Sequence, residues 1–455
     1  MQKKFNYKIN NNYSLKKIKI LQQIKKINSK FEKKKITSSY AQNLYFAPTA
    51  EYYGLLKILK LSKQHIDISL YIKIIKNILG GIFFSNPEII KKKNIIQYSN
   101  TIITWANKAN FDTDGSLNDK YFNVNSKNTK KTLWIVIYLD KDLPINIRHN
   151  IDDNIIIYRN KLKRYNYFNF AKFLYKKIIN IKSTELLMHN LSNYTYFSEN
   201  FFGKIKKYLI KDLKCLYLLY EAQPFQNNII FNLKKKNFRT KILGYVHAAP
   251  LSLPANYIFR KYSPDKIIVN GEDQFECFTK RLYWPKKFVI IKPSIRFFRN
   301  KSNDMSNKIF LPLGIRNHDH ILIQIDNLIK KYNFKIFNFV IQKHPLSANS
   351  KEIINFEKKL NKILNRQIKL KDTKNPRKLS IFIGSSGAII EALERGMDVI
   401  QVCENPIIET YSNKLLKNIL IKKIDSNIFS YKLKNKDKIV KLGNFNNHQN
   451  FMKKI

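Results

Sequence analysis

Short apolar runs alternate with helix-like segments through most of the chain. The runs 132–139 (TLWIVIYL) and 154–160 (NIIIYRN) are β-rich and bounded by polar turns, and the segments 170–181 and 202–210 between later runs have helical spacing. Further runs follow at 215–220 (CLYLLY), 240–246 (TKILGYV), 266–271 (KIIVNG) and 287–293 (KFVIIKP). Alternating strands and helices predict a parallel sheet with helices on its faces.

The alternation restarts after a stretch, 293–308, that has few apolar residues. Strand-like runs are 309–314, 334–345, 379–386 and 398–403, and helical patterns cover 319–332, 350–364 and 386–396. The predicted fold is therefore α/β, with two Rossmann-like doubly wound domains facing a cleft and a mainly helical N-terminal extension. The predicted boundaries are 1–125 for the basic extension, 126–295 for the first Rossmann-like domain, 296–308 for a linker, 309–425 for the second Rossmann-like domain and 426–455 for a tail.

Composition narrows the possible partners. The chain carries 84 Lys and Arg against 32 Asp and Glu, a net charge of +52, but its lysines are spread over the whole length. Because no segment concentrates arginine and aromatic residues, nucleic acid is an unfavourable partner, whereas an anionic membrane surface stays open. The cationic stretch 70–84 has apolar positions at helical spacing, which fits either a membrane-surface helix or a core helix.

No run approaches the roughly 20 apolar residues of a spanning helix, and the N-terminus lacks the apolar block of a secretory signal. We expect a cytoplasmic protein, peripheral at most to the inner face of the cytoplasmic membrane. Three widely spaced cysteines without a C-x-x-C pattern argue against zinc and disulfides.

The candidate ligand-binding residues fall at strand ends, where open parallel sheets bind ligands. His344 and Pro345 end one strand of the second unit, and the next strand ends in Ser385, Ser386 and Gly387, which open a helix containing Glu391. Unpaired amides and small hydroxyl residues at such a point can bind a phosphate without a metal. A simple N-cap role for the serines is the alternative.

The first unit offers a carboxylate and an imidazole in equivalent positions. Glu221 follows the run 215–220, two residues before Gln223, and His247 ends the next strand. Burial at a strand end can raise the pKa of a glutamate and make it a base, although a helix-start carboxylate is a serious alternative. Glu272 and Asp273 end a further strand and are expected only to cap the following helix.

Asp112 and Asp114 form a D-x-D pattern in NFDTDGSLND (110–119). No apolar strand leads into it and Asp-Gly favours a turn, so we infer no metal and keep Asp114 as a candidate for the acceptor cleft.

The pair of motifs QKHP (342–345) and GSSGAIIEAL (384–393) resembles the HP and Ser-Ser motifs of bacterial sialyltransferases and Kdo transferases. These are GT-B-fold glycosyltransferases of surface carbohydrate biosynthesis, and the resemblance covers roughly residues 130 to 410. It implies that His344, Ser385 and Ser386 contact the phosphate of a CMP-activated sugar. YEAQPFQNN (220–228) is similar to the E-x-x-x-W-x-N stretch of Kdo transferases, with Phe225 in place of Trp, which implies Glu221 as the base.

The sequence thus predicts a metal-independent, inverting glycosyltransferase without a cofactor. It would move a CMP-linked nonulosonic acid or Kdo-like sugar to a surface polysaccharide or lipid-linked glycan. The alternatives are a UDP- or GDP-sugar transferase or epimerase of the same fold, and a non-catalytic membrane-associated scaffold for glycan assembly.

Overall fold

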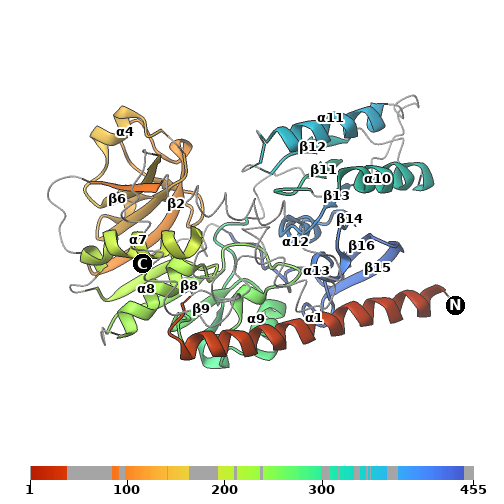
Figure 1. Ribbon diagram of the computed structural model, residues 1–455, viewed down its shortest axis with the longest axis horizontal. Coiled ribbons are helices and arrows are strands. Elements are labelled where there is room, and N and C mark those ends of the chain that lie inside the picture. Colours follow the sequence, from red (N-terminus) through yellow and green to blue (C-terminus); the bar gives the residue numbers. More distant parts are fainter. Residues whose placement is uncertain are drawn as a thin grey trace.

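The computed structural model describes most of both predicted units and the N-terminal helix (Figure 1). The described residues are 2–37, 85–91, 98–140, 142–162, 193–209, 213–235, 239–298, 307–315, 317–332, 339–344, 347–348, 350–365 and 378–444. The predicted helix 170–181, the cationic stretch 70–84 and Pro345 lie outside them.

The first sheet has eight strands in the order β1-β6-β5-β2-β7-β8-β9-β10. Neighbouring strands pair in parallel, except that β1 pairs antiparallel with β6. Apart from β1 at the edge, chain order runs outward from β2 in both directions, which is the doubly wound arrangement. The strands are β1 (Ser85–Ile90), β2 (Asn100–Ala106), β5 (Thr132–Tyr138), β6 (Ile155–Leu162), β7 (Cys215–Leu219), β8 (Lys241–Tyr245), β9 (Lys266–Val269) and β10 (Val289–Ile291).

Buried apolar runs account for the central strands. Every residue of β5 is buried, as expected for a strand covered on both faces. The helices of this unit are α4 (Ile145–Asn150), α7 (Asn193–Leu209), α8 (Pro224–Lys235) and α9 (Glu272–Lys280). In α8, Phe225, Ile229, Ile230 and Leu233 recur at helical spacing and are all buried.

Two strands lie earlier in the chain than the sequence predicted. The sequence predicted a mainly helical extension over residues 1–125. β1 and β2 lie within that range, so from residue 85 onward this part of the chain contributes strands to the first sheet. β2 is a β-branched run, TIITWA preceded by Asn100, and it is the strand from which the sheet is built outward. It pairs in parallel with β5 along one edge and with β7 along the other, and β-branched residues favour such a strand over a helix.

The second sheet has six strands in the order β12-β11-β13-β14-β16-β15. The first four pair in parallel, whereas β16 pairs antiparallel with both β14 and β15. The strands are β11 (Lys308–Phe310), β12 (Val340–Gln342), β13 (Leu379–Ile383), β14 (Asp398–Val402), β15 (Ile419–Asp425) and β16 (Ile428–Leu433). The helices are α10 (His318–Tyr332), α11 (Lys351–Asn365), α12 (Ala388–Glu394) and α13 (Pro406–Glu409). Two doubly wound α/β units are therefore present, as predicted.

β16 extends this sheet past residue 425, where the sequence predicted a tail. The chain then returns to the first unit. The carboxylate of Asp273 in α9 accepts hydrogen bonds from the backbone and side-chain nitrogens of Asn418, both at 2.7 Å, and Glu272 pairs with Lys438 at 2.8 Å. These two acids join the units and do not cap α9 with their side chains, which corrects their expected role.

Helix α1 (Gln2–Lys33) runs along the lower edge of both units in Figure 1. The Nζ of Lys17, a buried residue, donates to the carbonyl of Ile408 at 2.9 Å, and burial lowers the pKa of Lys17 to about 7. At the other end, Glu32 pairs with Arg260 of the first unit at 3.3 Å. The helix therefore fastens the two units to each other.

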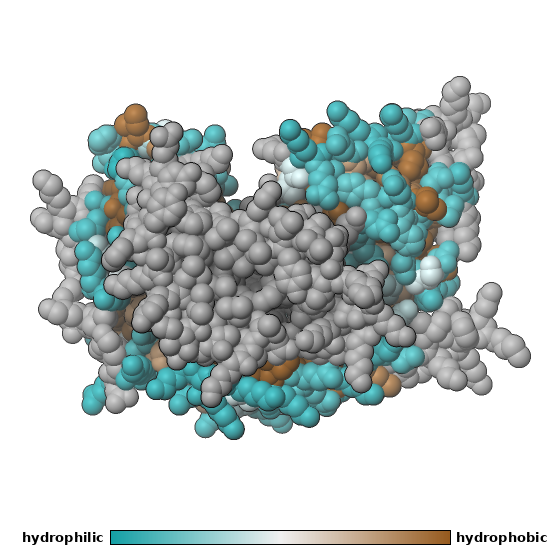
Figure 2. Space-filling model, viewed as in Figure 1, coloured by the Kyte–Doolittle hydropathy of each residue, from teal (hydrophilic) through white to brown (hydrophobic). Residues whose placement is uncertain are grey.

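The molecular outline has a notch between the two lobes at its upper edge, and most of the coloured surface is hydrophilic (Figure 2). Within the described residues, no helix combines the length and the apolar character that crossing a membrane requires. Membrane-surface attachment through 70–84 stays a prediction.

Candidate functional site

The candidate site lies where the strand order of the first sheet reverses. β2 is flanked by β5 on one side and by β7 on the other, so the carboxyl ends of β2 and β7 border the topological switch point. Trp105 is next to last in β2, Glu221 follows β7, and His247 follows β8, the neighbour of β7. The fold thus brings together the two residues that the sequence placed at strand ends.

The backbone around Glu221 is held tightly. Ala222 has a positive φ of 57°, and the Gln226 side chain accepts hydrogen bonds from the amides of Glu221 and Gln223 at 3.0 and 3.1 Å. Asn256 Nδ2 donates to the Glu221 carbonyl at 2.9 Å. Gln226, not Glu221, therefore satisfies the amides that precede α8, which weakens the helix-start interpretation of the glutamate.

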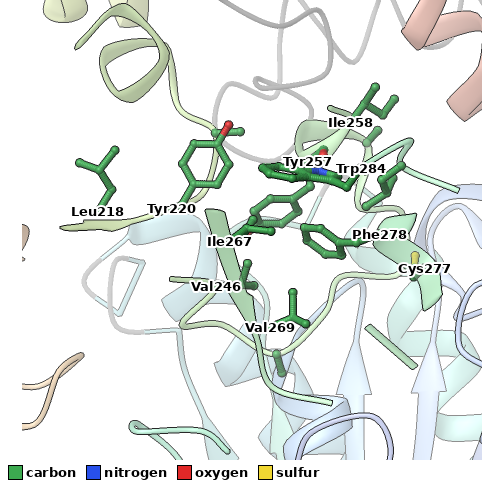
Figure 3. Packing of buried hydrophobic residues seen from close by; sticks show 14 of the residues in the cluster. Leu218, Tyr220, Val246, Tyr257, Ile258, Ile267, Val269, Cys277, Phe278 and Trp284 are labelled. Atoms are coloured by element: carbon green, nitrogen blue, oxygen red, sulfur yellow. Dashed lines mark hydrogen bonds between the residues drawn. The ribbon is translucent and has the colours of Figure 1, made fainter. Parts of the chain in front are cut away.

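The residue before Glu221 anchors this turn in the core. Tyr220 is buried, with its ring 6.2 Å from the Tyr257 ring and 6.4 Å from the Trp284 ring (Figure 3). Its hydroxyl donates to Asn227 Oδ1 at 3.2 Å, and Asn227 in turn donates to the Ala222 carbonyl. The aromatic packing of Tyr220 and the hydrogen bonds of Asn227 thus fix the position of the Glu221 backbone.

Glu221 and His247 form a bonded pair. Glu221 Oε1 lies 3.3 Å from His247 Nε2, and Gln223 Nε2 donates to Glu221 Oε2 at 2.7 Å. The Glu221 side chain is 18% exposed and that of His247 only 4%, so the carboxylate is the member that a ligand can reach. We call these two residues the Glu221–His247 pair.

The electrostatics correct one expectation. Burial favours the uncharged form of Glu221, but His247, Gln223 and Arg296 together outweigh it, so the pKa of Glu221 lies below its ordinary value. Burial lowers the pKa of His247, with Glu221 opposing that effect. At neutral pH the pair is therefore a carboxylate beside a neutral imidazole, and the predicted raised pKa of Glu221 is wrong.

Aromatic rings surround the imidazole. The Tyr121 ring packs edge-on against His247 at 4.8 Å, and the Trp105 ring lies 6.2 Å from it and 6.0 Å from Phe225. His247 Nδ1 is buried without a hydrogen-bond partner among the described residues. The packing fixes the imidazole plane, so that Nε2 faces the carboxylate.

In the second sheet, the GSSG turn (Gly384–Gly387) follows β13 at the corresponding switch point. Gly384 has a φ of +69°. A Cβ added to it would lie 3.6 Å from the Cβ of Pro312, which follows β11. The Ser347 hydroxyl donates to the Pro312 carbonyl at 3.4 Å, and its amide donates to the His344 carbonyl at 3.0 Å. The turn after His344 and the GSSG turn therefore flank the same residue.

The two serines differ in what their hydroxyls can donate. The buried Ser252 Oγ donates to the Ile408 carbonyl at 2.8 Å and lies 3.0 Å from Ser385 Oγ, so Ser385 must be the donor between them. Ser386 Oγ accepts from the Ala388 amide at 3.2 Å, which leaves its own proton available. Ser386 precedes Gly387, the N-cap residue of α12, and its hydroxyl donates to no group among the described residues, so it is the better candidate to bind a phosphate oxygen.

A loop of the first unit reaches this turn. A Cβ on Gly387 would lie 3.0 Å from the Ala249 carbonyl, and the Tyr411 hydroxyl lies within donating distance of two carbonyls, that of Pro250 at 3.0 Å and that of Ser386 at 2.9 Å. Since Ala249 and Pro250 come two and three residues after His247, the Glu221–His247 pair is tied to the GSSG turn through a few residues of backbone.

Other predicted residues are less directly joined to these groups. His344 follows β12, and β11 lies between β12 and β13, the strand that leads into the GSSG turn. His344 is half-buried, and this burial lowers its pKa. Glu391 pairs with Arg395 at 3.1 Å, one turn along α12. Asp114 lies on an exposed turn, 2.5 Å from Lys127, which together with Ser116 holds the pKa of Asp114 well below its ordinary value.

Three residues near the site were missed by the sequence analysis: Tyr121, Ser252 and Arg296. Ser252 lies in SLP, a few residues past the HAAP that did draw attention, and Arg296 stands at the first residue of the predicted linker. Neither had a strand end to mark it.

No protein-family profile and no curated protein matches the chain. Several solved structures are similar to it at low identity. A glycosyltransferase from Rickettsia africae has 11% identity and a TM-score of 0.31, over 67% of this chain and 79% of that one. An α,α-trehalose 6-phosphate synthase from Burkholderia multivorans has 9% identity and a TM-score of 0.36, over 62% and 77%.

The catalytic domain of starch synthase IV from Arabidopsis thaliana, bound to ADP and acarbose, has 9% identity and a TM-score of 0.33, over 72% and 86%. Likenesses this weak do not fix an activity, so the function has to be inferred from the residues of the chain itself.

Proposed function

We propose that the chain is a GT-B-type glycosyltransferase that moves a sugar from a nucleotide-activated donor to a surface polysaccharide or lipid-linked glycan. The donor would be a CMP-linked nonulosonic acid or Kdo-like sugar. The observation that carries the proposal is the reachable carboxylate of the Glu221–His247 pair, tied through Ala249 and Pro250 to the GSSG turn. A base and a phosphate-binding turn at facing strand ends are what such a transfer needs.

In this mechanism, Glu221 takes the proton of the acceptor hydroxyl as its oxygen attacks the anomeric carbon. The bond from that carbon to the donor phosphate breaks, and the nucleotide leaves with the electron pair. Attack opposite the leaving group inverts the anomeric configuration. Ser386 and His344 donate hydrogen bonds to the phosphate oxygens, where negative charge develops.

His247 is a positioning residue in this scheme. It is almost fully buried and holds Glu221 Oε1, while Gln223 holds Oε2. Removing the imidazole leaves burial as the dominant influence on the carboxyl, so the pKa of Glu221 should rise.

We expect His247→Asn to move the acid limb of the pH–rate profile to higher pH, because a base works only above its pKa. Transfer should therefore fall more at pH 5 than at pH 8. The exposed His149, replaced in the same way, is the control. Profiles that stay parallel from pH 5 to 8 would remove His247 from this role.

The nucleotide is best identified by thermal shift. CMP should raise the melting temperature more than UDP or GDP at equal concentration, because a single phosphate needs fewer compensating charges than a diphosphate. At 100 times Kd the stabilisation is about 2.7 kcal/mol. Metal independence is part of the proposal, so the shift and subsequent transfer assays should be unchanged by EDTA.

Preference for UDP or GDP would instead favour a transferase or epimerase using a diphosphate donor. A protein that no nucleotide stabilises would favour the scaffold alternative and overturn the enzyme.

A further inference from the structure

Arg296 brings a positive charge to the Glu221–His247 end of the first sheet on a fixed backbone. The Ile295 amide donates to the hydroxyl of Tyr245, at the end of β8, at 3.2 Å, and the amide of Arg296 donates to Ser294 Oγ at 3.2 Å. The backbone amide of Ser294 donates to the Lys441 carbonyl at 2.9 Å. The segment that carries Arg296 is therefore held between the first sheet and the returning C-terminal segment.

The guanidinium of Arg296 contacts rings and no carboxylate. Its Cζ lies 5.2 Å from the Tyr121 ring centroid and 5.2 Å from that of Phe297. Among the described residues it makes no side-chain hydrogen bond and no ion pair. Four other arginines each lie within 4 Å of a glutamate oxygen: Arg148, Arg159, Arg260 and Arg395.

Arg296 is linked to the candidate base by direct packing. The Tyr121 ring that it covers lies against His247 at 4.8 Å, and His247 Nε2 lies 3.3 Å from Glu221 Oε1. The charge of Arg296 acts on both members of the pair and favours the carboxylate of Glu221. A cation that forms no ion pair within the described part of the chain therefore lies one ring away from the imidazole that holds the base.

A second cation lies against the same ring. Lys120 Nζ is 5.4 Å from the Tyr121 centroid, and after burial it is the charge of Arg296 that lowers the pKa of Lys120. Asp119 and Asp140 oppose this effect, yet both carboxylates are bonded elsewhere. Asp119 accepts from the Thr104 hydroxyl and the Phe122 amide, and Asp140 accepts from the Lys108 amide at 2.8 Å.

We propose that Arg296, assisted by Lys120, binds an anionic group of the glycan that reaches Glu221. Arg296 and Lys120 are like charges at one ring, and neither forms an ion pair among the described residues, so an anion bound there would stabilise both. A guanidinium offers paired N–H donors whose spacing matches a carboxylate or a phosphate. The inference deepens the proposed function: it rests on Glu221 being the acceptor-side base, and it makes the acceptor an acidic or phosphorylated sugar.

Binding of three probes tests the inference without any turnover. Glucuronic acid, glucose 6-phosphate and glucose are titrated by ligand-observed NMR against the wild-type protein and Arg296→Gln. The wild type should bind at least one of the two anionic sugars more tightly than glucose. Arg296→Gln should lose about tenfold for that sugar, the scale of a hydrogen-bonded charge. Whichever anionic probe shows the loss identifies carboxylate or phosphate as the group bound.

Arg239→Gln is the matched control, because it removes the same charge from an exposed position. Arg239 lies before the amino end of β8, whereas the Glu221–His247 pair lies at the carboxyl ends of the strands. This control variant should bind all three probes like the wild type. Arg296→Lys keeps the charge but not the paired donors and should fall between. If Arg296→Gln does not fold, Lys120→Gln carries the test, with an expected loss of about threefold on the same scale.

Equal losses in Arg239→Gln and Arg296→Gln would mean that the anions bind the basic surface in general, and this would overturn the inference. So would wild-type affinity in Arg296→Gln. Either result leaves nucleotide stabilisation untouched. Failure of the proposed function would appear instead as a wild-type protein that no nucleotide stabilises, so the two failures are distinguishable.

Discussion

Glu221→Gln should abolish transfer while nucleotide binding persists. Glutamine keeps the length of the side chain and can still accept from His247 Nε2, but it cannot take a proton from the acceptor hydroxyl. We expect the transfer rate to fall by about 10²-fold or more, the range of a lost general base. The rate is measured on the same preparation as nucleotide affinity and melting temperature.

The helix-start alternative predicts a different outcome. A cap or dipole contact contributes at most about 1 kcal/mol to stability, so Glu221→Gln would lower the melting temperature slightly and keep its activity. Glu276→Gln is a suitable control, since Glu276 is bonded to Lys280 and Lys417 on the surface of α9. Normal transfer by Glu221→Gln would remove this residue from the mechanism and shift attention to Asp114 or His247.

The fold could be predicted where the strands are buried on both faces. β13 and β5 are apolar runs with one small hydroxyl residue each, Ser380 and Thr132, and all of their residues are buried. β15 and β16 were missed because they form a half-exposed antiparallel hairpin, in which lysines occupy outward positions and break the apolar run. In a chain whose lysines are spread over its whole length, such strands resemble a polar tail.

The site could be predicted only as far as strand ends reveal it. We could place Glu221 and His247 near each other because they follow neighbouring parallel strands, whose carboxyl ends lie at the same end of the sheet. In the structure, Glu221 Oε1 lies 3.3 Å from His247 Nε2. The direction of the Glu221 pKa could not be predicted, since it depends on partners as well as burial. Arg296 was missed for a related reason: it follows β10 on a segment whose fixed position comes from contacts with Lys441 and Tyr245, far away in the sequence.

His344→Ala is expected to lower transfer by about 10²-fold, the scale of one lost hydrogen-bond donor to a developing negative charge. β12 ends two residues before His344, and Lys343 is fixed to Glu357 of α11 at 2.9 Å, so the direction of the strand end is set by its neighbours. The chain should fold normally without the imidazole. Initial rates and melting temperature, both at pH 7.5, are the measurements.

The protonation state of His344 sharpens this test. Burial lowers its pKa from 6.5, so at pH 7.5 the imidazole is neutral and acts on the phosphate through one N–H rather than through a charge. His344→Gln, which retains an N–H donor, should therefore recover part of the rate, and the exposed His149→Ala should match the wild type. Wild-type transfer by His344→Ala would exclude the residue from donor binding. A full loss in His344→Gln as well would mean that bound donor keeps the imidazole protonated and that this imidazolium gives its proton to the leaving nucleotide, because an amide donates a hydrogen bond but does not give up its proton.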